Sequence, residues 1–202
     1  MKHASTHALF DYWNRQRGWR RTPARSEIDP SDIRHVLSDT FMLAADFVDG
    51  IRFRLAGTCV CALFSREVKG ELFNTLWSEA SREPLENLLD AVVNESVGVV
   101  AGVLGRTEYQ TEAELELLLL PLALDSATRI RALGALVPLT SPYWLGEQAI
   151  IELELRTFRH VGGSQSDFGA RRFGLRHEEP RARHGFLVYS GGLELPDDQR
   201  TG

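Results

Sequence analysis

The pattern of hydrophobic and polar positions divides the chain into alternating stretches and stretches with a helical repeat. Positions 40–46 and 51–56 alternate as β-strands with one buried face do. Asp49-Gly50 between them is typical of a hairpin turn, because glycine accepts a positive φ at no steric cost. On the second run the apolar and basic side chains take opposite faces: Ile51, Phe53 and Leu55 against Arg52 and Arg54. We therefore expect a sheet with one covered face and one face in water.

Three further alternating runs follow in the second half of the chain. Positions 99–109, 111–122 and 129–139 are predicted to be strands, and Asp125-Ser126 supplies turn residues between the last two. Along the middle run, apolar residues alternate with acidic ones: Ala113, Leu115, Leu117 and Leu119 against Glu112, Glu114 and Glu116. We expect these glutamates on the wet face of the sheet, beside arginines of neighbouring strands.

Helical repeats lie before and between the strands. One apolar stripe predicts a helix over 84–95; it consists of Leu85, Leu88, Leu89, Val92 and Val93. An N-terminal helix over 6–17 is predicted from Thr6 as its cap and Gly18 as its end. Asp29-Pro30 is a strong start signal for a short third helix.

The last third of the chain is less regular. Alternation over 151–156 predicts one strand, and 186–189 predicts a last short one. The stretch 160–184 is rich in glycine, arginine and histidine and is expected to be a loop.

Composition places the chain among ordinary globular proteins. It has 202 residues, 43% of them hydrophobic and 25% charged, with only two cysteines. Such a chain buries a sizeable core without a disulfide framework. The first residues contain no signal-peptide pattern, and the longest apolar run, 117–124, is too short to span a bilayer. We expect a cytoplasmic protein.

Charge is unevenly distributed along the chain. Residues 71–120 hold ten acidic and two basic residues, whereas residues 1–25 hold six basic and one acidic residue. A basic end can touch nucleic acid or acidic lipid, but a solvated, arginine-rich helix end is the favoured interpretation. Neither a nucleic-acid nor a membrane partner is therefore expected.

The order of the elements resembles the PAS fold: two strands, a block of short helices, a longer helix, then three antiparallel strands. The segments LFDYWNRQRG, RSEIDPSDIRHVL, RFRLAGT and GGL are similar to a PAS-like family of single-domain proteins common in alphaproteobacteria. Gly70 stands where PAS domains usually have a glycine. The resemblance implies an α+β fold with a five-stranded antiparallel sheet, helices on one face, N-terminal helices and a C-terminal β extension.

This resemblance also divides the chain. Residues 1–28 form an N-terminal helix and linker, 29–140 the PAS-like domain, and 141–202 an extension with short strands and a disordered end. It implies a bacterial sensory or signalling module that binds a small ligand, a protein partner or both, and has no catalysis of its own. The alternatives are a protein-interaction adaptor with a filled core and an enzyme with an unrecognised site.

In a PAS fold, ligands bind between the inner sheet face and the helices. The residues expected to line that space are Phe53, Leu55, Leu63, Phe64, Leu89, Val93, Leu117, Leu119 and Leu136. They form either a pocket or a closed core; an apolar lining favours a small, largely apolar molecule.

The N-terminal helix carries an apolar stripe of Leu9, Phe10 and Trp13. Burying three such side chains contributes roughly 5–8 kcal/mol, so the stripe packs either on its own sheet or on another copy. Because PAS domains commonly dimerise through a helix before the first strand, we expect a homodimer with these residues at its interface.

Residues with metal or redox chemistry are sparse. Cys59 and Cys61 lie two apart, so on a helix their side chains diverge; buried structural roles are expected for both. His3 and His7 are spaced as a chelating pair but lack a third ligand nearby in sequence. No metal site, catalytic residue or definite cofactor is predicted, and the resemblance leaves haem and flavin open.

Overall fold

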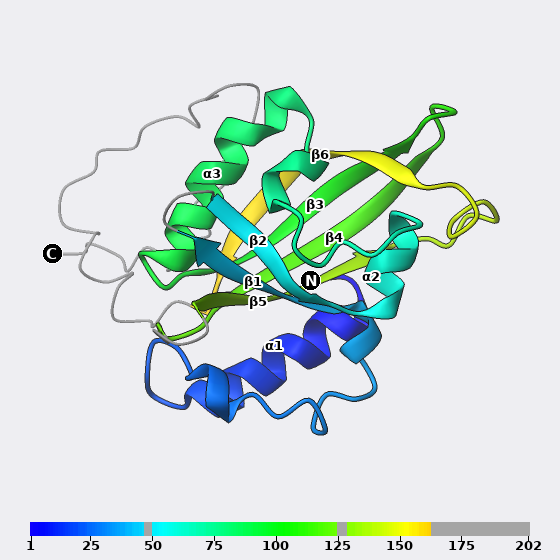
Figure 1. Ribbon diagram of the computed structural model, residues 1–202. Helices are drawn as coiled ribbons and strands as arrows, with labels where there is room; N and C mark the ends of the chain where they lie inside the picture. Colours follow the sequence, from blue (N-terminus) through cyan, green and yellow to red (C-terminus); the bar gives the residue numbers. More distant parts are fainter. Residues whose placement is uncertain (47–49, 125–128, 163–202) are drawn as a thin grey trace, which may run out of the picture.

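The computed structural model describes residues 1–46, 50–124 and 129–162 (Figure 1). The helical elements are α1 (Ala4–Arg17), η1 (Arg25–Glu27), η2 (Leu37–Asp39), α2 (Thr58–Leu63), η3 (Phe73–Leu76) and α3 (Glu79–Val93). The strands are β1 (Thr40–Asp46), β2 (Gly50–Ala56), β3 (Gly98–Thr107), β4 (Glu112–Pro121), β5 (Ile130–Pro138) and β6 (Ile150–Val161). The expected loop over most of 160–184 and the expected strand at 186–189 lie outside the described residues.

The strands form one antiparallel sheet in the order β2-β1-β5-β4-β3-β6, which confirms the predicted α+β class. The sheet has six strands rather than five, because β6 pairs with β3 along its length. The alternation that predicted a strand in the C-terminal extension is real: Ile150, Leu153 and Leu155 are buried against α3 and the sheet. The sheet therefore continues beyond residue 140.

Helices cover both faces of the sheet, so the expectation of one wet face is wrong. α2, η3 and α3 pack on one face, where the core includes Phe41, Phe53 and Trp77. α1 packs on the other face over β4 and β5, as Figure 1 shows, and buries Leu9 and Trp13 completely. We call these the α3 face and the α1 face.

The apolar stripe of α1 is satisfied within its own chain. Leu9 and Trp13 have no exposed surface, and the indole Nε1–H of Trp13 donates to the Pro121 carbonyl at 2.8 Å. Phe10 is half-buried and packs beside Trp13 with a centroid distance of 6.1 Å. In this arrangement Leu9 and Trp13 have no surface to offer a second copy, because the stripe that suggested a dimer already lies on the sheet.

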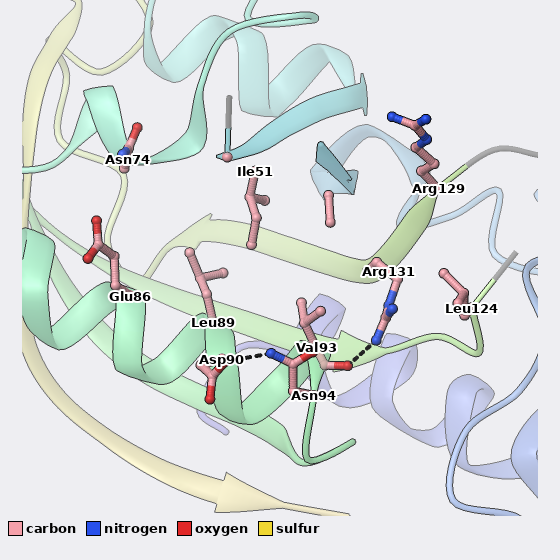
Figure 2. Close-up of a pocket in the computed structure, with 12 residues that line it drawn as sticks. Ile51, Asn74, Glu86, Leu89, Asp90, Val93, Asn94, Leu124, Arg129 and Arg131 are labelled. Carbon is pink, nitrogen blue, oxygen red and sulfur yellow. Dashed lines mark hydrogen bonds between the residues drawn. The ribbon is translucent and has the colours of Figure 1, made fainter. Parts of the chain in front are cut away.

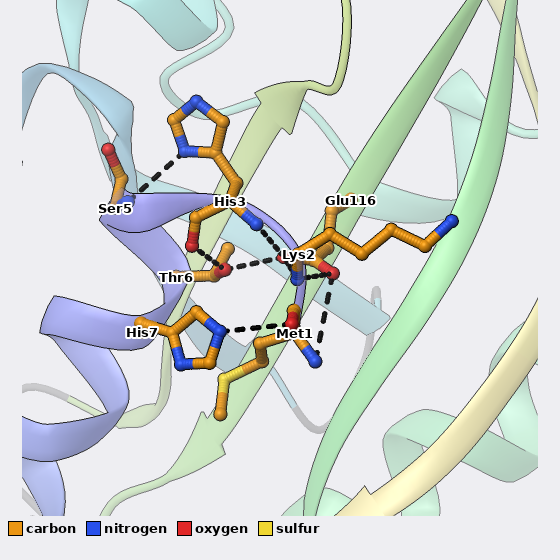
Figure 3. Close-up of polar contacts among 7 residues, drawn as sticks. All are labelled: Met1, Lys2, His3, Ser5, Thr6, His7 and Glu116. Atoms are coloured by element: carbon orange, nitrogen blue, oxygen red, sulfur yellow. Dashed lines mark hydrogen bonds and ion pairs between the residues drawn. The ribbon is translucent and has the colours of Figure 1, made fainter.

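Glu116 fixes the start of α1 and is buried, not solvated as its place in the acidic alternation suggested. Its carboxylate accepts hydrogen bonds from the backbone N–H groups of Lys2 and His3 at 2.7 and 3.1 Å and from the Thr6 hydroxyl at 2.5 Å (Figure 3). The Met1 amine lies 4.0 Å away. Thr6 is therefore not the cap; the helix begins at Ala4, and the ring Nδ1 of His3 accepts from the Ser5 N–H.

The short helix predicted from Asp29-Pro30 is not formed. Residues 30–36 make a run of turns instead, in which the Asp29 carboxylate accepts from the Ser31 N–H at 2.9 Å. Asparagine and aspartate side chains often make this local bond in place of a helix. Ile33 and Val36 are nevertheless buried on the α1 face.

A β-bulge in β2 interrupts the alternation of its side chains between the two sheet faces, so the residues before and after the bulge are out of step. The ladder with β1 passes from Met42–Leu55 to Leu43–Phe53, so Arg54 is an extra residue. Phe53 therefore faces α3 and is buried, whereas Leu55 shares the face of Met42 and is 46% exposed. The expectation that Leu55 lines the interior with Phe53 is wrong, because one inserted residue changes the period-2 parity.

Both outer edges of the sheet make hydrogen bonds with neighbouring segments of the chain. At β2, the Phe53 N–H donates to Glu71 O at 3.0 Å, and the Gly70 N–H donates to Phe53 O at 2.8 Å. At β6, the Ser78 N–H donates to Leu153 O at 2.9 Å, and the Leu155 N–H donates to the Ser81 hydroxyl at 3.0 Å.

Candidate ligand cleft

The interior below α2 and η3 is filled by aromatic side chains. The rings of Phe41, Phe53, Phe73 and Trp77 are in successive contact, with centroid distances between 5.3 and 5.8 Å. All four residues are buried. This part of the α3 face is a packed core and leaves no room for a ligand without rearrangement.

A cleft opens beside this core, between the C-terminal half of α3 and the ends of β1, β2 and β5 (Figure 2). Its volume is about 420 Å³. The residues that line it are Ala45, Gly50, Ile51, Asn74, Glu86, Leu89, Asp90, Val93, Asn94, Leu124, Arg129 and Arg131. Small-molecule sites typically measure roughly 300–1,000 Å³, so this cleft is large enough for a small ligand.

The apolar part of the cleft comes from both walls. Leu89 and Val93 belong to the predicted stripe of α3, and Ile51 points toward them from the start of β2 (Figure 2). The helix begins at Glu79, earlier than predicted, so Pro84 lies in its second turn. The stripe itself is as expected, since Leu85, Leu88, Leu89 and Val92 are all buried.

The polar rim of the cleft follows the exposed side of α3. Glu86, Asp90 and Asn94 are four residues apart, so they lie one above the other along the helix. The Asn94 side-chain amide donates to the Asp90 carboxylate at 2.5 Å. An acidic border of this kind disfavours ligands that would place an anionic group against α3.

Arg131 supplies the opposite wall and is held by the helix end. Its guanidinium Nη2 donates to the Val93 carbonyl, in the last turn of α3. A cation is favoured here because the carbonyls at a helix C-terminus carry partial negative charge. Nε of Arg131 is buried and has no hydrogen-bond partner among the described residues. The guanidinium therefore retains hydrogen-bonding capacity beyond its contact with α3.

A second bulge explains why Arg131 reaches α3. The ladder between β1 and β5 passes from Leu43–Ala132 to Ala44–Ile130, which leaves Arg131 as the extra residue. Ile130 consequently packs on the α1 face and Ala132 on the α3 face. Regular alternation along β5 would place Arg131 on the face opposite Ala132, and the sequence contains no signal for this bulge.

The nine residues expected to line a pocket separate into three groups. Leu89 and Val93 line the cleft. Leu55 is exposed at the sheet edge. The remaining six are buried in the packed core: Phe53, Leu63, Phe64, Leu117, Leu119 and Leu136. The polar residues of the cleft were missed, because helix periodicity and strand alternation identify core positions and not the rim of an opening.

The cysteines do not have the buried structural role that was expected. α2 buries Val60 and Leu63, which leaves Cys59 exposed and Cys61 partly buried on its other sides. Both thiols are free. Burial raises the pKa of the Cys61 thiol, and its hydrogen bond to Glu67 adds to this effect. A raised pKa keeps a thiol protonated and unreactive.

The histidines of α1 serve local structure. The His3 ring accepts from Ser5, and His7 Nε2 is 2.9 Å from the Met1 carbonyl. Within residues 1–46, 50–124 and 129–162, no group of three or more His, Cys, Asp or Glu side chains is arranged to hold a metal. In the same residues, no helix is long and apolar enough to cross a membrane.

Comparison with known proteins adds one finding. The family model for the PAS domain matches residues 1–137 of the 202-residue chain, a stretch that includes α1, β1 to β4 and all but the last residue of β5. The resemblance inferred from the segment motifs is thereby confirmed. A search of curated proteins finds no match.

Proposed function

Because this chain belongs to the PAS domain family, we propose that it is a sensory module that binds a small molecule in the cleft beside α3 and catalyses no reaction of its own. The cleft itself carries the proposal: about 420 Å³ of space remains against a family-typical helix and sheet, next to an otherwise filled core. An arginine with an unpartnered nitrogen stands at one wall.

The lining favours a particular ligand chemistry. Ile51, Leu89 and Val93 offer an apolar surface on two sides. Arg131 offers hydrogen-bond donors on the side away from the acidic residues of α3. A small, largely apolar molecule with one carboxylate or carbonyl group satisfies both, with its oxygen toward Arg131.

The contact between Arg131 and the Val93 carbonyl gives such binding a route to a structural response. An acceptor group on the ligand competes with this carbonyl for the same guanidinium. Weakening the contact changes how firmly the end of α3 is held against β5. Ligand binding then shifts the equilibrium between the two positions of α3, one with and one without the Arg131 contact. The size of the shift is set by the difference between the ligand's affinities for these two positions.

The second candidate function is a protein-interaction adaptor, and the filled aromatic core favours it. Phe41, Phe53, Phe73 and Trp77 occupy the space below η3. In this case the cleft holds only water and the module acts through its outer surface. The proposed homodimer also remains compatible with either function, but it requires a surface other than Leu9 and Trp13.

Binding of the fluorescent probe anilinonaphthalene sulfonate tests the proposal, since the probe combines an apolar ring system with one anionic group. The wild-type protein is expected to enhance its fluorescence. Leu89→Trp fills the cleft and is expected to abolish the enhancement, whereas Glu83→Trp, on the exposed side of the same helix, is expected to retain it.

Circular dichroism of each variant establishes that it is folded. A folded Leu89→Trp protein that binds the probe as well as the wild type would remove the cleft from consideration. The absence of binding to the wild-type protein, by this probe and by a library of small aliphatic and aromatic acids, would favour the adaptor.

A further inference from the structure

An exposed tryptophan, Trp19, lies just after the end of α1. Trp19 is 95% exposed, although Trp13, six residues earlier, is completely buried. Gly18 ends the helix with φ of 56° and reverses the chain, so Trp19 projects from a turn. Tryptophan offers a large apolar area with a polar N–H, which is why it is favoured at interfaces. A fully exposed one is unusual in a surface that has no partner.

The residues around Trp19 are basic. We call residues 15–25 the basic turn; it contains five arginines and no acidic residue. Arg20 is paired with Glu27 at 2.8 Å, which offsets one of these charges. Arg15 and Arg21 are exposed. The basic turn is thus a positive surface on a chain whose net charge is −5.

The basic turn has a fixed shape. Arg17 donates to the Arg20 carbonyl at 3.1 Å, and Arg20 donates to the Gln16 carbonyl at 2.9 Å. The Glu27 carboxylate accepts from the Ala24 N–H at 2.7 Å. These bonds hold the loop that carries Trp19 against the end of α1, so the tryptophan is presented from an ordered surface.

A second exposed apolar side chain lies at the same end. The Ala123 N–H donates to the Pro23 carbonyl at 2.9 Å, which joins the segment after β4 to the basic turn. Leu124 follows and is 63% exposed. In Figure 1 the segment after α1 and the end of the β4–β5 pair lie together at one end of the molecule.

We infer that the basic turn docks on the anionic phospholipid surface of a bilayer, with Trp19 and Leu124 at the interface and the arginines at the headgroups. Tryptophan prefers the level of the headgroups, and basic side chains near an anionic leaflet add to the binding. The contact is peripheral and reversible, because two apolar side chains do not give stable insertion.

Lipid fits these residues better than nucleic acid does. Sites for single strands combine a basic groove with aromatic platforms on which several bases stack. The basic turn contains a single aromatic residue, Trp19, and the exposed apolar residue at the same end, Leu124, is aliphatic and cannot stack with a base. A bilayer provides both phosphate and an apolar layer.

Co-sedimentation of the full chain with vesicles tests the inference. Binding is expected to vesicles of phosphatidylcholine and phosphatidylglycerol in equal parts, and not to vesicles of phosphatidylcholine alone. Trp19→Ala is expected to lower the partition coefficient about tenfold, and Arg15→Gln and Arg21→Gln about fivefold each. Salt near 1 M shortens the Debye length to about 3 Å and should release the protein.

Tyr143→Ala and Arg82→Gln are the matched controls, because both residues are exposed and lie outside the basic turn. Both variants should bind vesicles as the wild type does. No binding to anionic vesicles, or equal loss in the control variants, would overturn the inference. Binding to a single-stranded oligonucleotide but not to vesicles would assign the basic turn to nucleic acid instead. Leu124 borders the cleft, but the substituted residues Trp19, Arg15 and Arg21 do not line it, so the outcome with vesicles is independent of the probe experiment.

Discussion

The two faces of the sheet are covered in different ways. On the α1 face, one amphipathic helix is fixed at its start by Glu116 and at its end by the Trp13–Pro121 hydrogen bond. On the α3 face, a packed core that includes four aromatic rings lies beside a cleft of about 420 Å³.

In the proposed function, the α1 face supports the sheet and the α3 face responds to the ligand. The α1 face has both polar contacts and apolar burial at the two ends of its helix, so α1 moves only if several interactions break together. At the end of α3, Val92 is buried in the core and Arg131 bonds the Val93 carbonyl, and this end adjoins an open space. In the proposed function, a ligand would contact this end of α3, while the opposite face keeps the strands in register.

Of the substitutions that test this comparison, Trp13→Ala is expected to have the largest effect on the free energy of unfolding. It removes a fully buried side chain and its hydrogen bond, and changes of this kind cost about 3–5 kcal/mol of unfolding free energy. Urea denaturation followed by far-ultraviolet circular dichroism measures the loss. Phe10→Ala, on the same helix but half-buried, should cost clearly less. Equal losses would mean that α1 is not anchored as described.

Glu116→Gln is expected to have an intermediate effect, about 1.5–3 kcal/mol, because the hydrogen bonds made to a charged group are among the stronger ones. The amide of glutamine also places a donor against the N–H groups of Lys2 and His3. Glu114→Gln is the control, since Glu114 is exposed on the same strand. A loss no larger than that of the control would contradict the anchoring role of Glu116.

The contribution of Glu116 also predicts a pH dependence. Burial raises the pKa of this carboxyl, but the hydrogen bonds from Thr6, His3 and Lys2 outweigh burial, and the net pKa is lowered. The carboxylate therefore adds stability above the unfolded pKa of about 4.3, and this is lost as pH falls through the lower folded value. The stability gap between wild type and Glu116→Gln should narrow in acid; a gap independent of pH would speak against an ionised Glu116.

Leu55→Ala is expected to have the smallest effect, within about 0.5 kcal/mol, because the Leu55 side chain is 46% exposed. Phe53→Ala, two positions earlier, should cost about 3–5 kcal/mol because Phe53 belongs to the aromatic core. The pair is a direct test of the bulge at Arg54 by urea denaturation. Comparable losses at the two positions would show that regular alternation continues through β2.

Periodicity was sufficient to predict most strands of the sheet and the α3 stripe, because these depend on repeated local patterns, whereas the family was inferred from the resemblance in element order and segment motifs. The exceptions have specific physical causes. Arg54 and Arg131 are extra residues in bulges, and a single inserted residue exchanges the two faces without changing composition. Glu116 looked like its exposed neighbours, and only the docking of α1 shows why it is buried.

The surface on which α1 packs could not be predicted from the sequence either. Its apolar stripe required a partner surface, and both the chain's own sheet and a second copy met that requirement. The choice depends on which sheet positions remain uncovered, and that follows from the tertiary arrangement of Leu118, Leu120 and Leu133. The cleft could not be predicted from the sequence either, because it is a volume that the surrounding side chains leave unfilled.

The hydrogen-bonded edges of the sheet restrict the ways in which this protein joins others. An exposed strand edge is a template for an incoming strand, which leads to strand recruitment by partners and to self-propagating aggregates. Here the backbone groups of Phe53 on one edge and of Leu153 on the other are already occupied. The bonds already made at Phe53 and Leu153 disfavour the addition of a strand at these positions, where recognition through side chains is favoured instead.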